Sequence, residues 1–458
     1  MKYHADPRRI SLLPPTGRAL LGAVALALLA ACAYALARML AIGAPLAGMD
    51  FSHLAHAADS AAAGLISGGV LLAILSIAWH LIEPPKIALC RRVRRAVADP
   101  SDGNPLHLKE NQRVPKVRCE GSKTAGRYTV RLAIAGTTPE RVEGATSAIS
   151  ACLTGRYDRY AVVAANADVA GSYIDLRIED TSIDWAIRAN TPAELVGESP
   201  YLLRVDRRTA IDLRTSTSIL VAGRTRSGKT YGIISLLLQA LSSGPDRYGS
   251  RIVVIDPKGA ELSRLPGVAS PSTCGDMTAV LDAMRAFNAL RIERQQHLNA
   301  LSEKSGTAAK WWDSGMKISL LFIDEYVACR GMFPEKSQLC EFDNLLRQIV
   351  TMGASAGCYA IICIAQPSVG EGGLPSMVRN GCTTRVLFRP TPDDARMMWP
   401  DGIANLPSRD YGQGAALFST TDGEHEQPTP VQFPTMNFEE MDALRRLMEK
   451  YGDRAGVL

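Results

Sequence analysis

The sequence predicts an α/β protein built on a mostly parallel sheet, preceded by a small α+β domain and two N-terminal transmembrane helices. Three observations predict this fold class. Two long apolar runs lie near the start of the chain, short β-rich apolar runs alternate with helical stretches from about residue 201 onward, and one strand-to-helix junction carries a complete phosphate-binding motif. Strands that alternate with helices form parallel sheets covered on both faces. Ligands should therefore gather at the carboxyl ends of these strands.

The composition is that of a folded chain with reduced thiols. Its 458 residues suffice for two or three domains at about 100–200 residues each. Hydrophobic residues make up 47% and charged residues 21%, which excludes a disordered or fibrous protein. The ten cysteines include no C-x-x-C pair, so zinc-finger spacing is absent. The net charge of +5 is compatible with a nucleic-acid partner but does not argue for one, because much of the excess flanks the apolar runs.

Residues 19–42 and 61–82 are predicted to be transmembrane helices. Each run is long enough to cross about 30 Å of hydrocarbon as a helix. A cleaved signal peptide is the alternative for the first run, and buried helices of a soluble protein are the alternative for both. Basic residues occur in the segment 1–18 and after the second run, whereas residues 43–60 contain neither Lys nor Arg. The positive-inside rule therefore predicts two cytoplasmic termini and an external loop at 43–60.

The cytoplasmic part begins with residues 83–115, predicted to be a basic juxtamembrane segment and linker. Its arginines at positions 91–95 could bind DNA, but contact with anionic lipid beside the second span is the favoured interpretation. Residues 116–200 are predicted to form the small α+β domain, in which no site chemistry is visible. Its expected elements are strands at 128–134, 160–163 and 173–178 and a helix at 139–153.

Residues 201–435 are predicted to form the parallel-sheet domain, and residues 436–458 a C-terminal helical tail. The expected strands of the sheet are residues 218–222, 251–255, 318–323, 359–365, 385–388 and 415–418.

A phosphate-binding loop follows the first of these strands and matches G-x-x-x-x-G-K-[ST] in full. Its residues are Gly223, Arg224, Thr225, Arg226, Ser227, Gly228, Lys229 and Thr230. The glycines allow backbone N–H groups to surround phosphates at a helix N-terminus. Lys229 would contact the β- and γ-phosphates of ATP, and the Thr230 hydroxyl would bind Mg²⁺. A chance match in a loop would lack the strand before it and the apolar helix after it.

An acidic pair, Asp324 and Glu325, ends the apolar strand at 318–323. We expect this strand to neighbour the strand of the phosphate loop. Asp324 would then hold Mg²⁺ through water, and Glu325 would orient and deprotonate the attacking water, which implies hydrolysis. The alternative is that Glu325 is an acid that favours a helix start. Gln366 ends another strand and could sense the γ-phosphate, although surface glutamines are common. Residues 256–258, taken alone, predict a turn.

Five segments together resemble the FtsK/SpoIIIE family of DNA-translocating ATPases. They are LVAG before the phosphate loop, VIDPKGAEL at 254–262, FIDEY at 322–326, IAQPSV at 364–369 and TRVLF at 384–388. The resemblance implies a RecA-like P-loop NTPase that assembles as a hexameric ring around DNA and is driven by ATP. It also implies a multi-pass protein of the bacterial inner membrane.

Several departures from the large chromosome-segregation members of that family are visible. There are two predicted spans, no long Pro/Gln-rich linker and no winged-helix domain after residue 433. The chain looks more like the short two-span coupling proteins of conjugative transposons and plasmids. That resemblance implies a relaxase and a type IV-like secretion channel as partners. Alternatives are a chromosome-partition motor, a type VII-like protein-secretion ATPase and a scaffold that binds ATP without hydrolysing it.

Basic residues outside the phosphate loop are assigned by the same resemblance. Arg385 aligns with a family Thr-Arg and is the first choice for the arginine that a neighbouring subunit inserts at the γ-phosphate; Arg347 is the second. A salt bridge or a DNA contact is the alternative. Arg330, Lys336 and Arg379 are candidates for contacts to DNA phosphates. Deleting residues 1–95 is expected to leave a soluble ATPase.

Overall fold

The computed structural model describes residues 15–47, 52–82, 84–98, 106, 115–122, 126–133, 138, 142, 144–168, 172–242, 251–268, 277–367, 373–400, 411–423 and 425–452. The chain divides into two compact units, Met1–Asp180 and Thr181–Leu458, and each is considered by itself. The first contains the apolar helices and the small domain, and the second contains the phosphate loop.

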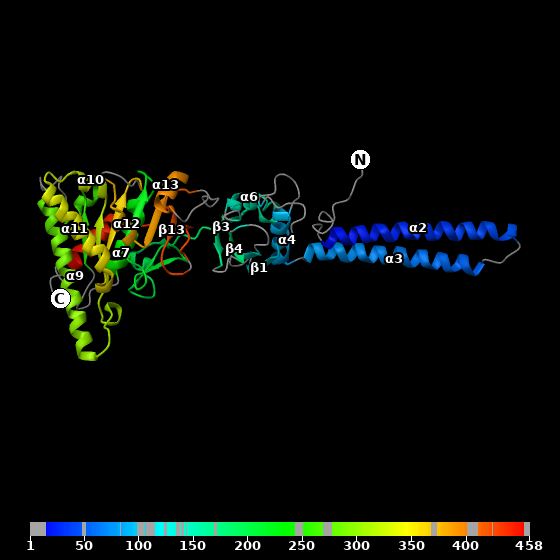
Figure 1. Ribbon diagram of the computed structural model, residues 1–458, viewed down its shortest axis with the longest axis horizontal. Helices are drawn as coiled ribbons and strands as arrows, with labels where there is room; N and C mark the ends of the chain where they lie inside the picture. The colour runs from blue at the N-terminus through cyan, green and yellow to red at the C-terminus, as the bar shows by residue number, and fades with distance from the viewer. Residues whose placement is uncertain are drawn as a thin grey trace. The chain divides into compact units, whose positions relative to one another are not determined.

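Two long apolar helices lie near the N-terminus, α2 (Pro15–Ala47) and α3 (Ser52–Ile82), and they pack side by side (Figure 1). Their stretches Leu21–Met39 and Ser52–Ala78 are long and apolar enough to cross a membrane. Only 11% and 17% of the residues in these stretches are buried, unlike the core helices of a soluble protein. Both helices extend into the segment predicted as an external loop at 43–60, because its Ala-rich ends favour helix.

The small domain is an antiparallel sheet with strand order β1-β2-β4-β3. Its strands are β1 (Val117–Ser122), β2 (Arg127–Ala133), β3 (Tyr160–Ala167) and β4 (Tyr173–Asp180), and its helix is α6 (Thr146–Ala151). The three predicted strands are confirmed, and in the two that were predicted from alternation, buried residues such as Val130 and Ile178 fill the core. Within the predicted helix at 139–153, residues 142, 144 and 146–151 are helical, residues 152–153 are not, and residues 139–141 and 143 lie outside the described residues.

Helix α4 (Pro85–Ala98) also belongs to this domain, so the basic juxtamembrane part of the predicted segment 83–115 is not separate from the small domain. Leu89, Val93 and Val97 repeat every four residues and are fully buried in the core that the sheet forms. On its other side the helix is basic. The Arg92 guanidinium donates to Thr154 and lies 5.6 Å from the centre of the Tyr157 ring.

The second unit is built on a seven-stranded sheet of order β14-β13-β12-β8-β11-β10-β9. Its strands are β8 (Ile219–Gly223), β9 (Ile252–Ile255), β10 (Ser319–Ile323), β11 (Cys358–Ile364), β12 (Thr384–Phe388), β13 (Ala415–Ser419) and β14 (Thr429–Gln432). Strands β12 to β9 in this order are parallel, and β13 and β14 are antiparallel. The mostly parallel sheet and all six predicted strands are confirmed.

One expectation about this sheet is wrong: β10, which leads to the acidic pair, does not neighbour β8. Strand β11 lies between them and pairs with both. All seven residues of β11 are buried, as a central strand covered on both faces requires. The acidic pair is therefore two strands away from the phosphate loop, and the end of β11 stands between them.

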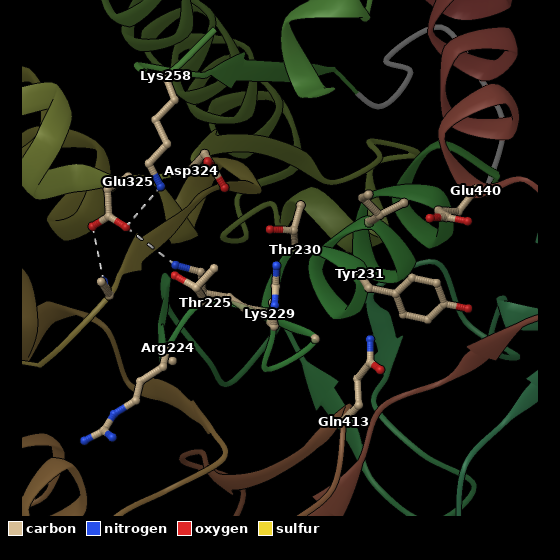
Figure 2. Close-up of a pocket in the computed structure, with 15 residues that line it drawn as sticks. Arg224, Thr225, Lys229, Thr230, Tyr231, Lys258, Asp324, Glu325, Gln413 and Glu440 are labelled. Atoms are coloured by element: carbon tan, nitrogen blue, oxygen red, sulfur yellow. Dashed lines mark hydrogen bonds and ion pairs between the residues drawn. The ribbon is translucent and has the colours of Figure 1, made fainter. Parts of the chain in front are cut away.

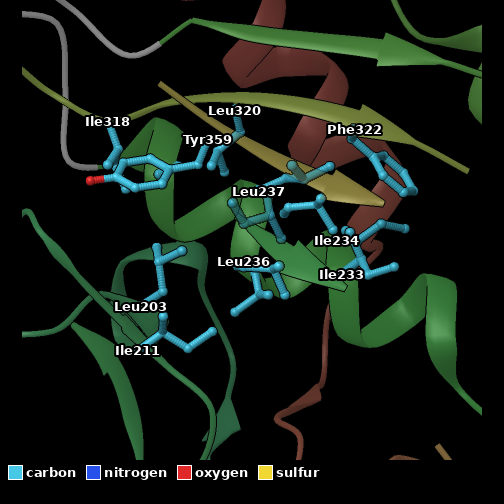
Figure 3. Close-up of a cluster of buried hydrophobic side chains, with 14 of the residues drawn as sticks. Leu203, Ile211, Ile233, Ile234, Leu236, Leu237, Ile318, Leu320, Phe322 and Tyr359 are labelled. Atoms are coloured by element: carbon cyan, nitrogen blue, oxygen red, sulfur yellow. The ribbon is translucent and has the colours of Figure 1, made fainter. Parts of the chain in front are cut away.

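Helices cover both faces of this sheet. On one face α7 (Lys229–Ser242) and α14 (Glu440–Gly452) pack against each other, and Ile233 and Leu237 of α7 meet Leu320 and Phe322 of β10 (Figure 3). On the other face the core includes Leu220, Phe287 and Phe342. The helices there and at the strand ends are α9 (Thr278–Ser305), α10 (Tyr326–Gly331), α11 (Lys336–Met352), α12 (Ser376–Gly381) and α13 (Pro392–Met398).

The limits of this unit differ from the predicted boundaries at 200/201 and 435/436. Strand β5 (Arg188–Ala189) pairs with β15 (Thr435–Met436), so segments from both predicted borders join. Leu195 before the predicted start and Leu444 in the predicted tail are buried in the same core. Two short strands near the start, β6 (Leu202–Arg204) and β7 (Ala210–Asp212), form a hairpin of their own.

The packing of α4 determines how much of the N-terminal region can be removed without disturbing the small domain. Deleting residues 1–83 should leave a soluble protein with a folded small domain. Deleting residues 1–95 should unfold that domain, because it removes Leu89 and Val93, each of which stabilises the fold by about 1.5–3 kcal/mol. Limited proteolysis of the two truncated proteins measures the difference. Equal protease resistance of the segment 115–180 in both would contradict the assignment of α4 to this core.

Candidate active site

The phosphate loop joins the end of β8 to the start of α7. Arg226 and Gly228 have φ values of 64° and 92°, in the left-handed region, so the backbone coils tightly before the helix begins at Lys229. The first N–H groups of a helix have no partner within the helix. The residues of this first turn, Lys229, Thr230 and Tyr231, line a cavity, which makes the junction a candidate anion-binding position.

Close packing explains two glycines of the loop. A Cβ on Gly223 would lie 2.9 Å from both Phe388 Cβ and Ser227 Oγ, and one on Gly228 would lie 2.7 Å from the backbone nitrogen of Gly414. Gly414 N–H also donates to Ser227 O at 3.1 Å. The turn before β13 therefore holds the loop from outside, and only glycine fits at the contact.

A cavity of about 300 Å³ opens above the loop (Figure 2). Its walls are Gly223, Arg224, Thr225, Arg226, Gly228, Lys229, Thr230, Tyr231, Ile234, Lys258, Asp324, Glu325, Ala365, Gln413 and Glu440. Seven of the eight residues of the predicted loop line it, and so do both members of the acidic pair. Ser227 is buried beneath, and its Oγ has no hydrogen-bond partner among the described residues.

Lys229 and Glu325 meet across this cavity. Lys229 Nζ lies 3.7 Å from Glu325 Oε2 and donates to Ile364 O at 3.4 Å. Glu325 Oε1 accepts a hydrogen bond from Ala365 N–H at 3.2 Å. The end of β11 therefore contacts both partners of the ion pair, and this contact aligns the helix-borne lysine with the strand-borne carboxylate.

Asp324 is buried at the same edge of the sheet. Burial raises the pKa of its carboxyl, and the ammonium groups of Lys229 and Lys258 oppose this shift. A divalent cation would add further positive charge and favour the ionised form. The Asp324 carboxylate and the Thr230 hydroxyl line one cavity and are hard oxygen donors, so the residues present fit Mg²⁺.

Other predicted residues do not line the cavity. Gln366 is exposed and follows the lining residue Ala365. Arg385 pairs in register with Leu220, well before the phosphate loop, and its Nη1 donates to Met398 O at 2.8 Å. Burial lowers the pKa of Arg385. Arg347 is exposed on α11 and donates to Asn344 Oδ1 at 2.7 Å.

The three candidates for DNA contacts differ in their surroundings. Arg330 is paired with Asp343, with Nη2 3.1 Å from Oδ2. Lys336 is exposed at the first position of α11. Arg379 lies on α12, and its Nε is buried without a hydrogen-bond partner among the described residues.

Six cavity residues were not predicted as site residues: Tyr231, Ile234, Lys258, Ala365, Gln413 and Glu440. The sequence did contain an indication of Lys258, because this residue follows the end of a predicted strand. The sequence contained no indication of Gln413 and Glu440, because they belong to C-terminal segments that reach the phosphate loop only in the folded protein. Tyr231 Oη exchanges hydrogen bonds with the backbone of Met436, which ties α7 to the segment before α14.

Replacing Gly228 with Ala should weaken nucleotide binding by about tenfold or more, equivalent to ~1.4 kcal/mol. The new Cβ would clash with Gly414 N and would also disfavour the φ of 92°. Gly412→Ala is the matched control, since its Cβ would meet no atom within 4 Å. Titration with a fluorescent ATP analogue measures both variants. Equal affinities would contradict the tight packing of the loop.

Comparisons with known proteins agree with this geometry. Residues 190–319 match the FtsK/SpoIIIE family. The FtsK domain-containing protein YdcQ of Bacillus subtilis is 26% identical over 149 residues, which cover 32% of this chain and 30% of that protein. DNA translocase FtsK of Chlorobaculum tepidum is 24% identical over 255 residues, which cover 51% of this chain and 29% of that protein. The chain thus spans less than a third of the length of these two relatives.

Among solved structures, the pCW3 conjugation coupling protein TcpA, a monomer with ATPγS, aligns with a TM-score of 0.47 and 13% identity. The alignment covers 79% of this chain and 99% of that one. The motif-based resemblance is confirmed over residues 190–319, which match the FtsK/SpoIIIE family and contain the phosphate loop.

Proposed function

We propose that the protein is a membrane-anchored, ATP-driven DNA translocase that serves as the coupling protein of a conjugative element. The observation that carries this proposal is the meeting of Lys229 and Glu325 across one cavity, 3.7 Å apart, in a unit whose residues 190–319 match the FtsK/SpoIIIE family. An ammonium for the phosphates and a carboxylate for the water are the two groups that ATP hydrolysis requires.

Nucleotide binding would use the loop and its helix. The backbone N–H groups of residues 224–230 and the Lys229 ammonium would take the phosphates. Thr230 would contact Mg²⁺ directly and Asp324 through water. The metal, when bound, would neutralise charge that develops on the phosphates. Ser227 Oγ is buried and has no hydrogen-bond partner among the described residues, so its hydroxyl would donate to a phosphate oxygen once nucleotide binds.

Hydrolysis would use the end of the two central strands. Glu325 would accept a proton from the attacking water, while Ala365 N–H holds its other oxygen. Gln366, one residue farther, would sense the γ-phosphate. Since Arg385 and Arg347 do not line the cavity of their own chain, either would act on the nucleotide of a neighbouring subunit. That role requires a ring, and we propose a hexamer.

DNA would pass through the ring and contact its basic loops. Lys336 is exposed and can bind phosphates without rearrangement. Arg379 Nε is buried and has no hydrogen-bond partner among the described residues, so it would first have to become exposed, and Arg330 would first have to exchange its bond to Asp343. We therefore rank Lys336 before Arg379 and Arg330 as a DNA contact.

The membrane segment would anchor this motor with both termini in the cytoplasm of a bacterial cell. Helix α4 begins three residues after α3 ends, so its first turn lies within about 10 Å of the membrane exit. Its apolar face is occupied by the small domain, which leaves Arg94 and Arg95 exposed to meet anionic lipid. A relaxase and a type IV-like channel would be the partners at this position.

Duplex DNA should stimulate ATP turnover of the full-length protein in lipid nanodiscs by about tenfold or more, a barrier change of ~1.4 kcal/mol. The stimulation should weaken as salt rises, because phosphate contacts release counterions. If DNA does not change the rate of ATP turnover and a secreted peptide increases it, the result would contradict DNA translocation and favour a protein-secretion ATPase.

Glu325→Gln should keep ATP affinity and lower turnover by about 10²–10⁴-fold, because the amide cannot accept the proton of the water. Lys229→Ala should lose ATP binding itself. Glu303→Gln, an exposed change on α9, is the control for Glu325→Gln. Binding assays and phosphate release separate the two effects. A Glu325→Gln protein with normal turnover would remove the proposed base.

A further inference from the structure

Lys258 is held at the edge of the cavity by a rigid turn. The Asp256 carboxylate is fully buried and accepts hydrogen bonds from Lys258 N–H at 3.0 Å and Ala260 N–H at 2.9 Å. Gly259 adopts a φ of 62°, which the turn needs and glycine permits. The backbone of Lys258 is therefore fixed immediately after β9, the strand that neighbours β10.

The side chain of Lys258 reaches from this turn to Glu325 (Figure 2). Lys258 Nζ lies 3.6 Å from Glu325 Oε2, the oxygen that Lys229 approaches to 3.7 Å. Lys258 is 52% exposed, whereas Lys229 is 12% exposed and sits at the floor. Within the part of the chain that the structure describes, these are the two ammonium groups that pair with Glu325.

Lys229 and Lys258 cannot both keep their ion pairs with Glu325 once nucleotide binds. A triphosphate carries several negative charges, so its attraction for the Lys229 ammonium exceeds that of one carboxylate. Lys258 is anchored on the far side of Glu325 from the phosphate loop, on the outermost strand β9. It would then remain as the counter-ion of a buried carboxylate that would otherwise lose its charge partner.

We propose that Lys258 is the positioning residue for the proposed base: it holds Glu325 Oε2 while Ala365 N–H holds Oε1, and so fixes the carboxylate plane toward the attacking water. Two attachment points prevent rotation of the carboxylate, and one does not. The proposal rests on the proposed hydrolytic function of Glu325. It assigns to the strand-end lysine a role in the rate of hydrolysis rather than in ATP affinity.

The test compares Lys258→Gln, Lys258→Arg and the exposed control Lys304→Gln in the full-length protein. Lys258→Gln should lower kcat about 10–100-fold, the cost of a misplaced catalytic group, with KM for ATP within about threefold of wild type. Lys258→Arg keeps the charge and should recover most of kcat. Lys304→Gln should match wild type. Unchanged or increased kcat in Lys258→Gln would overturn the proposal.

A double-mutant cycle separates positioning from a structural effect. In single-turnover measurements, Lys258→Gln should cause no further loss when Glu325 is already Gln, because the two residues act as one unit. The same fold loss in both backgrounds would overturn the proposal in favour of a structural role. The proposed function fails separately, if the wild-type protein does not hydrolyse ATP. If the wild type hydrolyses ATP and Lys258→Gln equals it, this inference alone fails.

Discussion

The cavity depends on the compensation of two buried carboxylates by two ammonium groups. Asp324 and Glu325 lie at the end of one strand with little access to water, where an ionised carboxyl is costly without a partner. Lys229 and Lys258 supply the opposite charge from either side of Glu325. Removing one partner of such an arrangement leaves an uncompensated charge. The same charges suit magnesium nucleotide, so the groups that stabilise the cavity are also the groups that would bind the nucleotide.

The order of the sheet makes this compensation possible. Strand β11 stands between the strand of the loop and the strand of the acidic pair, and its end supplies Ile364 O to Lys229 and Ala365 N–H to Glu325. Two backbone groups of one segment thereby fix both partners of an ion pair. Gln366 is the residue after Ala365. If Gln366 contacts the γ-phosphate as proposed, loss of that phosphate on hydrolysis would act directly on the end of β11.

Local patterns were sufficient to predict most strands of the large sheet and most of the residues that line the cavity. The phosphate loop, Asp324 and Glu325 were found because each follows an apolar strand, and parallel strands end at one edge. The position of β11 could not be predicted, since strand order depends on long-range pairing that local periodicity does not encode. Helix α4 was missed because its arginines suggested a basic surface segment, although Leu89, Val93 and Val97 recur every four residues and are buried. Gln413 and Glu440 were missed because only the tertiary fold brings them near Thr230.

The most direct test of the account is the position of the divalent cation. Mn²⁺ can replace Mg²⁺ in crystals grown with a non-hydrolysable ATP analogue, and its anomalous scattering locates it without reference to the protein. The account predicts one peak between the Thr230 hydroxyl and the Asp324 carboxylate, with the γ-phosphate beside Lys229. A metal peak away from both side chains, or a triphosphate outside the loop at 223–230, would contradict it.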